Sequence, residues 1–233
     1  MDTSQLFALP LWYVVFLLSL TCHEAAHAWV AQRGGDFTAA MAGQVSLDPI
    51  PHIRREPFGM VLVPIFTFLL NGWMLGWASA PYNVMWARRY PKRAARMALA
   101  GPVANFALML IAVIGIKLGI VFGLFAAPDS LSFDHIVVMA DQSVNPITFV
   151  LSITFSLNLL LGTFNLLPVP PLDGNGIVPL FLDDHQGRRW QEIFANPSMA
   201  LMGLVIAWVV FGRLFGLIFD LGIFLLYPGI SYG

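Results

Sequence analysis

Charged residues are scarce in this chain of 233 residues. Asp, Glu, Lys and Arg together make up 11% of it, against roughly 25% in an ordinary soluble domain. The 12 Lys and Arg residues face 13 Asp and Glu residues, so the basic excess that phosphate binding requires is missing. Disorder needs low hydrophobicity and high charge, whereas 58% of this chain is hydrophobic. These deficits exclude a disordered chain, a soluble globular enzyme and a nucleic-acid binder.

Cysteine is nearly absent, because Cys22 is the only one. A single thiol excludes an internal disulfide framework and a zinc site built from several cysteines. The sequence also lacks internal repeats, low-complexity linkers and room for a soluble appendage of domain size between its apolar segments. We therefore expect residues 1–233 to form a single domain. No pattern in the sequence specifies an oligomeric state.

Long uncharged segments are what the chain has instead, and they reach the ~20 residues needed to cross a bilayer. They predict core helices near 9–31, 98–123 and 147–168, and an extra helix near 198–227. The first is not a cleavable signal peptide, because it lacks a basic N-terminal region and carries polar residues at its far end. The predicted fold class is an all-α polytopic membrane protein, a bundle of about four to six transmembrane helices in the lipid bilayer.

Lys and Arg residues predict the orientation, because they collect in cytoplasmic loops. Their positions place 32–57, 79–97 and 169–197 in the cytoplasm, and the acidic loop 125–147 outside together with both termini. The apolar segment 58–78 has basic flanks on both sides. A re-entrant hairpin fits these flanks better than the alternative, a full extra crossing, provided that its backbone is buried in protein.

Residues 37–53 differ from the long apolar segments in their sequence pattern. Their partly alternating pattern, which includes a proline at position 49, predicts one or two short strands at the membrane surface. Such a β element could offer an unpaired edge to an extended peptide. An irregular loop is the alternative interpretation.

The sequence His23-Glu24-Ala-Ala-His27 lies inside the first predicted helix. Side chains four residues apart share one helix face, so both imidazoles can bind one zinc ion at ~2.0–2.1 Å. Glu24 projects beside them, where it can accept a proton from water. Ionisable residues at membrane depth are rare unless they are functional. This pattern predicts a catalytic zinc site with Glu24 as the general base.

A third zinc ligand is required, because catalytic sites usually have three protein ligands and a water molecule. Asp173 is the best candidate, since the three prolines that precede it end a helix and free its carboxylate to turn inward. His23 lies ten residues before Arg33, about 15 Å from the cytoplasmic end of its helix. Both halves of the site therefore fall in the cytoplasmic half of the membrane. The other candidates are Cys22, His52, His135 and His185.

Three motifs resemble those of the site-2 proteases, which are intramembrane zinc metalloproteases. The first is the His23–His27 motif, the second is Ala100-Gly-Pro-Val-Ala-Asn105, and the third, the most specific, runs from Asn165 to Gly174. The segment 43–53 is similar to the small bacterial or archaeal branch of that family. Arg54 stands where this branch often has Asp, and no PDZ or CBS domain is present.

The resemblance implies a role for each matching residue. His23, His27 and Asp173 would bind one zinc ion per chain, with Glu24 as the base. Asn105 and Asn165 would contact the substrate, a single-span membrane protein cleaved within or near its transmembrane segment in regulated intramembrane proteolysis. An interhelical hydrogen bond is the alternative for Asn105, and packing is the interpretation for Asn158. The resemblance also implies an integral protein of a prokaryotic cell membrane.

Two other functions are consistent with the His23–His27 motif. A Ste24- or HtpX-like membrane metalloprotease would take a glutamate as its third ligand, and the later glutamates are Glu56 and Glu192. A zinc transporter or another non-enzymatic zinc-binding membrane protein would need a polar path through both leaflets. The polar residues of this sequence collect in one half instead, which favours the protease.

Overall fold

The computed structural model describes residues 3–230 and residue 232. Four long helices dominate it: α1 (Thr3–Arg33), α6 (Pro91–Val121), α7 (Pro146–Asn165) and α10 (Pro197–Leu226). All four contain an apolar stretch that is long enough to cross a membrane. They lie where the charge-free segments predict helices, and the all-α polytopic fold class is confirmed. Residues 1 and 2, at the N-terminus predicted to lie outside, fall outside the described residues.

The helix starts follow from local sequence. Pro146 and Pro197 each occupy the first turn. The side chains of Asn145 and Asn196, which precede them, accept hydrogen bonds from the free N–H groups of that turn. Proline suits this position because its missing N–H would have no partner there. Helix α6 begins at Pro91, earlier than predicted, since its basic first turns extend beyond the apolar segment.

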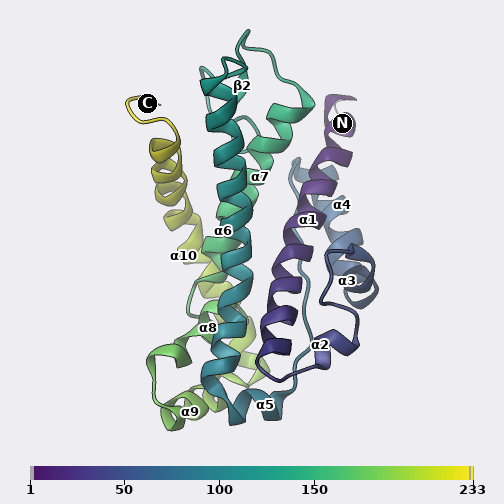
Figure 1. The fold of residues 1–233 in the computed structure, drawn as a ribbon, viewed down its shortest axis with the longest axis vertical. Coiled ribbons are helices and arrows are strands. Elements are labelled where there is room, and N and C mark those ends of the chain that lie inside the picture. Colours follow the sequence, from purple (N-terminus) through teal and green to yellow (C-terminus); the bar gives the residue numbers. More distant parts are fainter. Residues whose placement is uncertain (1–2, 231, 233) are drawn as a thin grey trace.

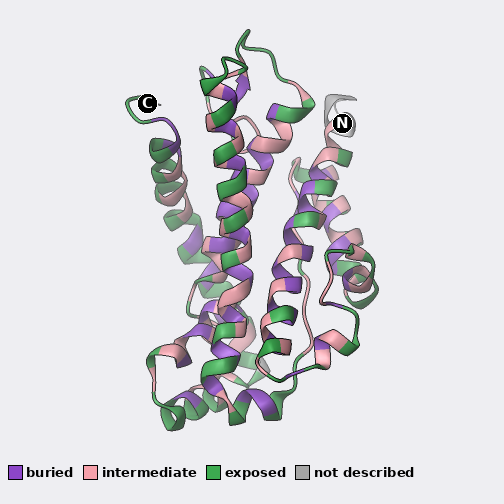
Figure 2. Cartoon of the chain, in the orientation of Figure 1, coloured by how far each residue is buried: buried purple, intermediate pink, exposed green. Residues whose placement is uncertain are grey.

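The core bundle consists of α1, α6 and α7 (Figure 1), and α10 contacts α7. One apolar cluster joins α1, α4 and α7, and a second joins α6, α7 and α10. Buried residues face these contacts, while the outward faces of α6 and α10 are largely exposed (Figure 2). Those exposed faces are apolar, as expected for contact with lipid: Leu110, Ile111, Ile114, Leu118, Val205, Trp208 and Val209.

The segment 58–78 is a hairpin. A π-helical turn, η1 (Phe58–Leu62), leads into α4 (Val63–Asn71), and Gly72 reverses the chain with a φ of 77°. The return leg is extended, and the Trp77 N–H donates to the Gly59 carbonyl at 3.1 Å. The helical leg spans about 21 Å at 1.5 Å per residue, less than the ~30 Å hydrocarbon core. This shape matches the predicted re-entrant segment.

The prediction of strands within 37–53 is wrong. This region forms two short helices, α2 (Thr38–Met41) and α3 (Pro49–Arg55). Asp48 caps α3 by accepting a hydrogen bond from the Ile50 N–H at 3.0 Å. The Asp-Pro pair is therefore a helix start and not the end of a strand. The small β element lies elsewhere, as the antiparallel strands β1 (Phe125–Ala126) and β2 (Val138–Met139) between α6 and α7.

The remaining short helices gather at the end of the bundle where α1 finishes (Figure 1). They are α5 (Val84–Arg89), α8 (Asp173–Ile177), the 3-10 turn η2 (Val178–Phe181) and α9 (Asp184–Phe194). The β-sheet lies at the opposite end, near the start of α1 and the end of α10. The basic segments around α5 and α9 and the acidic loop thus occupy opposite ends of the molecule (Figure 1).

Asp36 ties the end of α1 to the start of α5. It is 4% exposed. Its carboxylate accepts hydrogen bonds from the Thr38 N–H at 3.0 Å, from the Thr38 hydroxyl and from the Asn83 N–H at 2.7 Å. Burial by itself raises the pKa of Asp36, but these hydrogen bonds favour the charged form and bring the pKa below its usual value.

We predict that Asp36→Asn destabilises the protein at pH 7 by about 1–3 kcal/mol. Because the pKa is lower in the folded state, this stabilisation is complete above the unfolded value of about 3.9 and is lost as the pH falls through the folded value. Thermal unfolding in detergent should therefore show a melting-temperature deficit that shrinks below about pH 4. Asp129→Asn, at an exposed position in the loop between α6 and α7, is the control. Equal melting temperatures for Asp36→Asn and the parent at pH 7 would contradict the prediction.

Candidate active site

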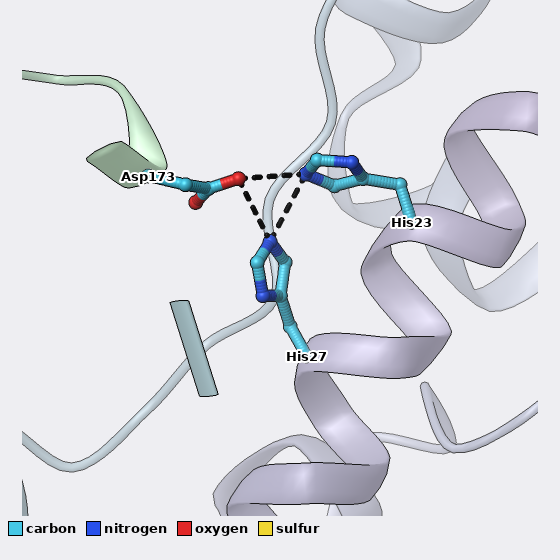
Figure 3. A group of neighbouring side chains, drawn as sticks. All are labelled: His23, His27 and Asp173. Atoms are coloured by element: carbon cyan, nitrogen blue, oxygen red, sulfur yellow. Dashed lines mark hydrogen bonds and ion pairs between the residues drawn. The ribbon is translucent and has the colours of Figure 1, made fainter. Parts of the chain in front are cut away.

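Three side chains from two distant segments meet at one point. His23 and His27 project from the same face of α1, and Asp173 is the first residue of α8 (Figure 3). Asp173 Oδ2 lies 3.0 Å from His23 Nε2 and 3.3 Å from His27 Nε2. The two Nε2 atoms are 3.0 Å apart. Within residues 3–230, this is the one group of His, Cys, Asp and Glu side chains that could hold a metal ion.

A proline-rich loop positions Asp173 beside the two histidines. Helix α7 ends at Asn165, and the next residues cannot continue it because Pro168, Pro170 and Pro171 interrupt the backbone ladder. The chain then folds back tightly: a Cβ atom on Gly174 would lie 2.3 Å from the carbonyl oxygens of Leu166 and Leu167. Only glycine permits this approach, so the loop starts α8 with the carboxylate beside α1.

Hydrogen bonds define the tautomers of both imidazoles. His23 Nδ1 lies 2.6 Å from Asn105 Oδ1, and His27 Nδ1 lies 2.7 Å from the Met97 carbonyl oxygen. The Met97 carbonyl accepts only, and so does Asn105 Oδ1, whose NH₂ group points to other acceptors. Both Nδ1 atoms therefore carry the proton. The Nε2 lone pairs of the two rings consequently face each other and the Asp173 carboxylate.

This arrangement fits a zinc ion. Three lone pairs that converge in a buried site repel one another unless a cation lies between them, and Asp173 Oδ2 has no hydrogen-bond donor among the described residues. Tetrahedral zinc with bonds of 2.0–2.1 Å separates its ligand atoms by about 3.3 Å, close to the separations found here. A Cβ atom on Gly101 of α6 would lie 2.4 Å from both Nε2 atoms, so glycine keeps this space open.

The candidate site is buried on one side and borders a cavity on the other. His23 and Glu24 are each 5% exposed, and His27 is 7% exposed. A cavity of about 430 Å³ lies beside His27 and Asp173, between α5, α6, α8, α9 and the start of α10. Its walls are largely apolar, and they include Met97, Pro170, Trp190 and Phe194. The cavity can give both water and a peptide segment access to the histidines.

The two predicted asparagines lie in different surroundings. Asn105 is fully buried behind His23, where its carboxamide bonds His23, Asn158 and the Ser19 carbonyl. These hydrogen bonds join α1, α6 and α7, as the interhelical alternative expects. Asn165 ends α7 half-buried, and its Nδ2 donates to the Leu161 carbonyl at 3.1 Å.

The alternative ligands lie elsewhere. Cys22, His52, His135 and His185 are not part of the cluster. His52 is buried, and its Nε2 is 3.1 Å from the Ser46 carbonyl oxygen. Glu56 accepts a hydrogen bond from the Ser79 hydroxyl at 2.6 Å. Glu192 is exposed on α9. The third glutamate ligand of a Ste24- or HtpX-like site therefore has no counterpart here.

Sequence reasoning missed two contributors to the site, both on α6. Gly101 lies inside a motif that carried the family resemblance, but its role depends on the closeness of α1 and α6. Met97 contributes its backbone carbonyl, which any residue type could supply. A small residue in the middle of an apolar helix was the available signal for Gly101, and Met97 gave none.

A helical bundle that buries an HExxH helix and an inward-turned carboxylate defines a multi-pass membrane zinc metalloprotease. Comparison with known proteins agrees: the sequence profile of peptidase family M50, the site-2 protease family, matches residues 11–210. The chain belongs to this family, and it is an integral membrane zinc metalloprotease.

Two relatives illustrate the match, and both are named "Putative zinc metalloprotease". YwhC of Bacillus subtilis is 34% identical over 172 residues, which cover 73% of this chain and 68% of the relative. Rip2 of Mycobacterium tuberculosis is 30% identical over 206 residues, which cover 88% of this chain and 70% of the relative. No solved structure matches the chain.

We predict that Gly101→Ala abolishes zinc binding while the protein stays folded. The added methyl group would occupy the space between the two Nε2 atoms. Metal analysis of the purified protein should fall from about one zinc per chain to a small fraction, with unchanged helical content by circular dichroism. Gly115→Ala on the same helix is the control, because its Cβ would meet only the end of the Leu151 side chain at 3.3 Å. Full zinc content in Gly101→Ala would show that the ion lies elsewhere.

Proposed function

We propose that this protein hydrolyses peptide bonds in or near the transmembrane segments of single-span membrane proteins, in regulated intramembrane proteolysis. His23, His27 and Asp173 hold one zinc ion per chain, and Glu24 is the general base. The observation that carries this proposal is the convergence of three ligand atoms inside a bundle of membrane-crossing helices. Membership of family M50 supports it.

Zinc, when bound, would supply a Lewis acid that polarises the scissile carbonyl and allows water to lose a proton near neutral pH and so become a nucleophile. The chain's own contribution is proton transfer and positioning. Glu24 follows His23 directly on α1, and it takes part in neither of the close His–Asp contacts found among the described residues. It can therefore accept the proton of the attacking water and deliver it to the leaving amine.

The substrate must unwind before it is cut. A transmembrane helix keeps its carbonyl groups in backbone hydrogen bonds, so a segment has to become extended to expose the scissile bond. The cavity beside His27 and Asp173 has apolar walls suited to the side chains of such a segment. Asn165 lies just before the loop that carries Asp173, and its carboxamide is suited to hold the backbone of the extended substrate.

Three substitutions separate metal binding from chemistry. Glu24→Gln keeps the size of the side chain but cannot accept a proton, so we predict a protein that retains about one zinc and no longer cleaves. Asp173→Ala and His23→Ala each remove one of three ligands, so both zinc and activity should drop. Metal analysis after mild chelation and a cleavage assay in proteoliposomes measure the two properties. Membrane proteomes of cells with the parent or Glu24→Gln should reveal the uncut single-span substrate.

Two results would contradict these roles. Cleavage by Glu24→Gln at the parental rate would show that Glu24 is not the general base. Full zinc in Asp173→Ala, together with zinc loss in Glu56→Ala or Glu192→Ala, would favour the glutamate-ligand class of membrane metalloprotease.

We further propose that the active site lies in the cytoplasmic half of a prokaryotic cell membrane. The basic residues at the end of the bundle nearest α5 and α9 support this orientation. In a Cys22→Ser background, a cysteine replacing Lys92 should resist membrane-impermeant thiol reagents in intact cells, and one replacing Asp129 should react. Both positions are exposed on the protein. The reverse pattern of labelling would overturn the orientation.

A further inference from the structure

A chain of buried hydrogen bonds runs from His23 away from the candidate zinc site and into the centre of the bundle. It links His23 and Ser19 of α1, Asn105 of α6 and Asn158 of α7. Ser19 is 1% exposed, and the two asparagines are fully buried. We propose that this chain, here termed the relay, fixes the tautomer and orientation of His23, and that Asn158 and Ser19 are positioning residues for zinc. The proposal rests on His23 being a zinc ligand.

The far end of the relay is anchored on main-chain carbonyls, which can only accept. The Ser19 hydroxyl donates to the Val15 carbonyl at 2.7 Å, so Ser19 Oγ accepts from Asn158 Nδ2 at 2.9 Å. The same Nδ2 donates to the Thr154 carbonyl at 2.9 Å. Both N–H groups of Asn158 are therefore committed. Its orientation follows from these anchors, because a flipped amide would set its oxygen against acceptors.

The orientation of the Asn158 amide in turn fixes the orientation of Asn105, which contacts His23. The Asn158 oxygen accepts from Asn105 Nδ2 at 2.9 Å, and Asn105 Nδ2 also approaches the Ser19 carbonyl at 3.4 Å. Asn105 Oδ1 is thus the atom that faces His23 Nδ1, at 2.6 Å. An acceptor at this position keeps the proton on Nδ1. His23 Nε2 is left with its lone pair aimed at His27 and Asp173, as zinc binding requires.

The two histidines differ in how they are held. His27 Nδ1 donates to the Met97 carbonyl oxygen, which belongs to the backbone of α6. His23 depends on side chains, and its orienting acceptor is itself oriented by Asn158. A reversed Asn105 amide would present N–H to His23 and favour the tautomer with the proton on Nε2. Asn158 makes no hydrogen bond to His23, so an effect of Asn158 on zinc would travel through Asn105.

Interhelical packing is the competing explanation, because the same bonds join α1, α6 and α7. A packing role would change the stability of the protein but not the affinity or geometry of the metal site. Losing an outer partner of a metal-binding histidine typically lowers metal affinity by about 10–100-fold. Zinc affinity and the metal's ligand geometry therefore separate the two roles.

The test compares the parent with Asn158→Leu, Ser19→Ala, Ser19→Thr and Ser156→Ala in detergent. Ser156 is the matched control: it lies on α7, it is fully buried, and its hydroxyl has no hydrogen-bond partner among the described residues. Zinc affinity is measured by competition with a chromophoric chelator. Ligand geometry is read from the visible absorption bands of protein loaded with Co²⁺, and folding from circular dichroism and thermal unfolding.

We expect Asn158→Leu to weaken zinc binding by about tenfold or more and to alter the Co²⁺ bands. Ser19→Ala should shift both in the same direction by a smaller factor, and Ser19→Thr, which keeps the hydroxyl, should restore the parental values. Ser156→Ala should match the parent in zinc affinity. If Asn158→Leu does not fold, the Ser19 pair decides the question by itself, since Ser19→Ala removes only one oxygen atom.

Parental zinc affinity and Co²⁺ bands in folded Asn158→Leu and Ser19→Ala would overturn the relay. His23→Ala distinguishes the two levels of the proposal. If His23→Ala loses zinc but the relay variants keep the parental zinc affinity, the relay proposal is wrong and the zinc-site proposal stands. Full zinc in His23→Ala would remove the site itself.

Discussion

Three lone pairs that meet in a buried pocket are the constraint on which the rest of this structure depends. His23 Nε2, His27 Nε2 and Asp173 Oδ2 lie 3.0–3.3 Å apart, and only a cation makes such a meeting favourable. The bundle must hold the three side chains in this arrangement for the ion to bind. The proline-interrupted loop after α7 and the tight packing at Gly174 supply that restraint, because both are fixed by covalent geometry and close contact.

The membrane environment makes unpaired polar groups in this site still less favourable. Polar groups in an apolar surrounding are costly unless they bond one another, and here they are gathered along the inner face of α1. The outward faces of α6 and α10 carry large apolar side chains instead. Polar chemistry and lipid contact are thus separated across each helix. The cavity beside Asp173 connects the polar interior to the basic end of the bundle, the side from which water can enter.

The fold and the meeting of His23, His27 and Asp173 were predictable because they depend on spacing and charge. Charge-free segments located four helices, and the i, i+4 histidines with a carboxylate after three prolines located the cluster. The short helices at 38–41 and 49–55 were missed, since an Asp-Pro helix start and a strand end look alike in a short segment. The surroundings of Asn105 and Asn158 were not predictable in full. The orientation of the Asn105 amide toward His23 depends on hydrogen-bond acceptors that three different helices contribute.

Helix α6 organises the site although it supplies none of the proposed ligands. Met97, Gly101 and Asn105 follow one another at intervals of four residues and therefore lie along one face. Because α6 runs antiparallel to α1 (Figure 1), that face meets the two histidines in reverse order. Met97 accepts from His27, and Asn105 accepts from His23. Gly101 lies between them, opposite both Nε2 atoms. One helix face thus aims both imidazoles and leaves the space where their lone pairs converge.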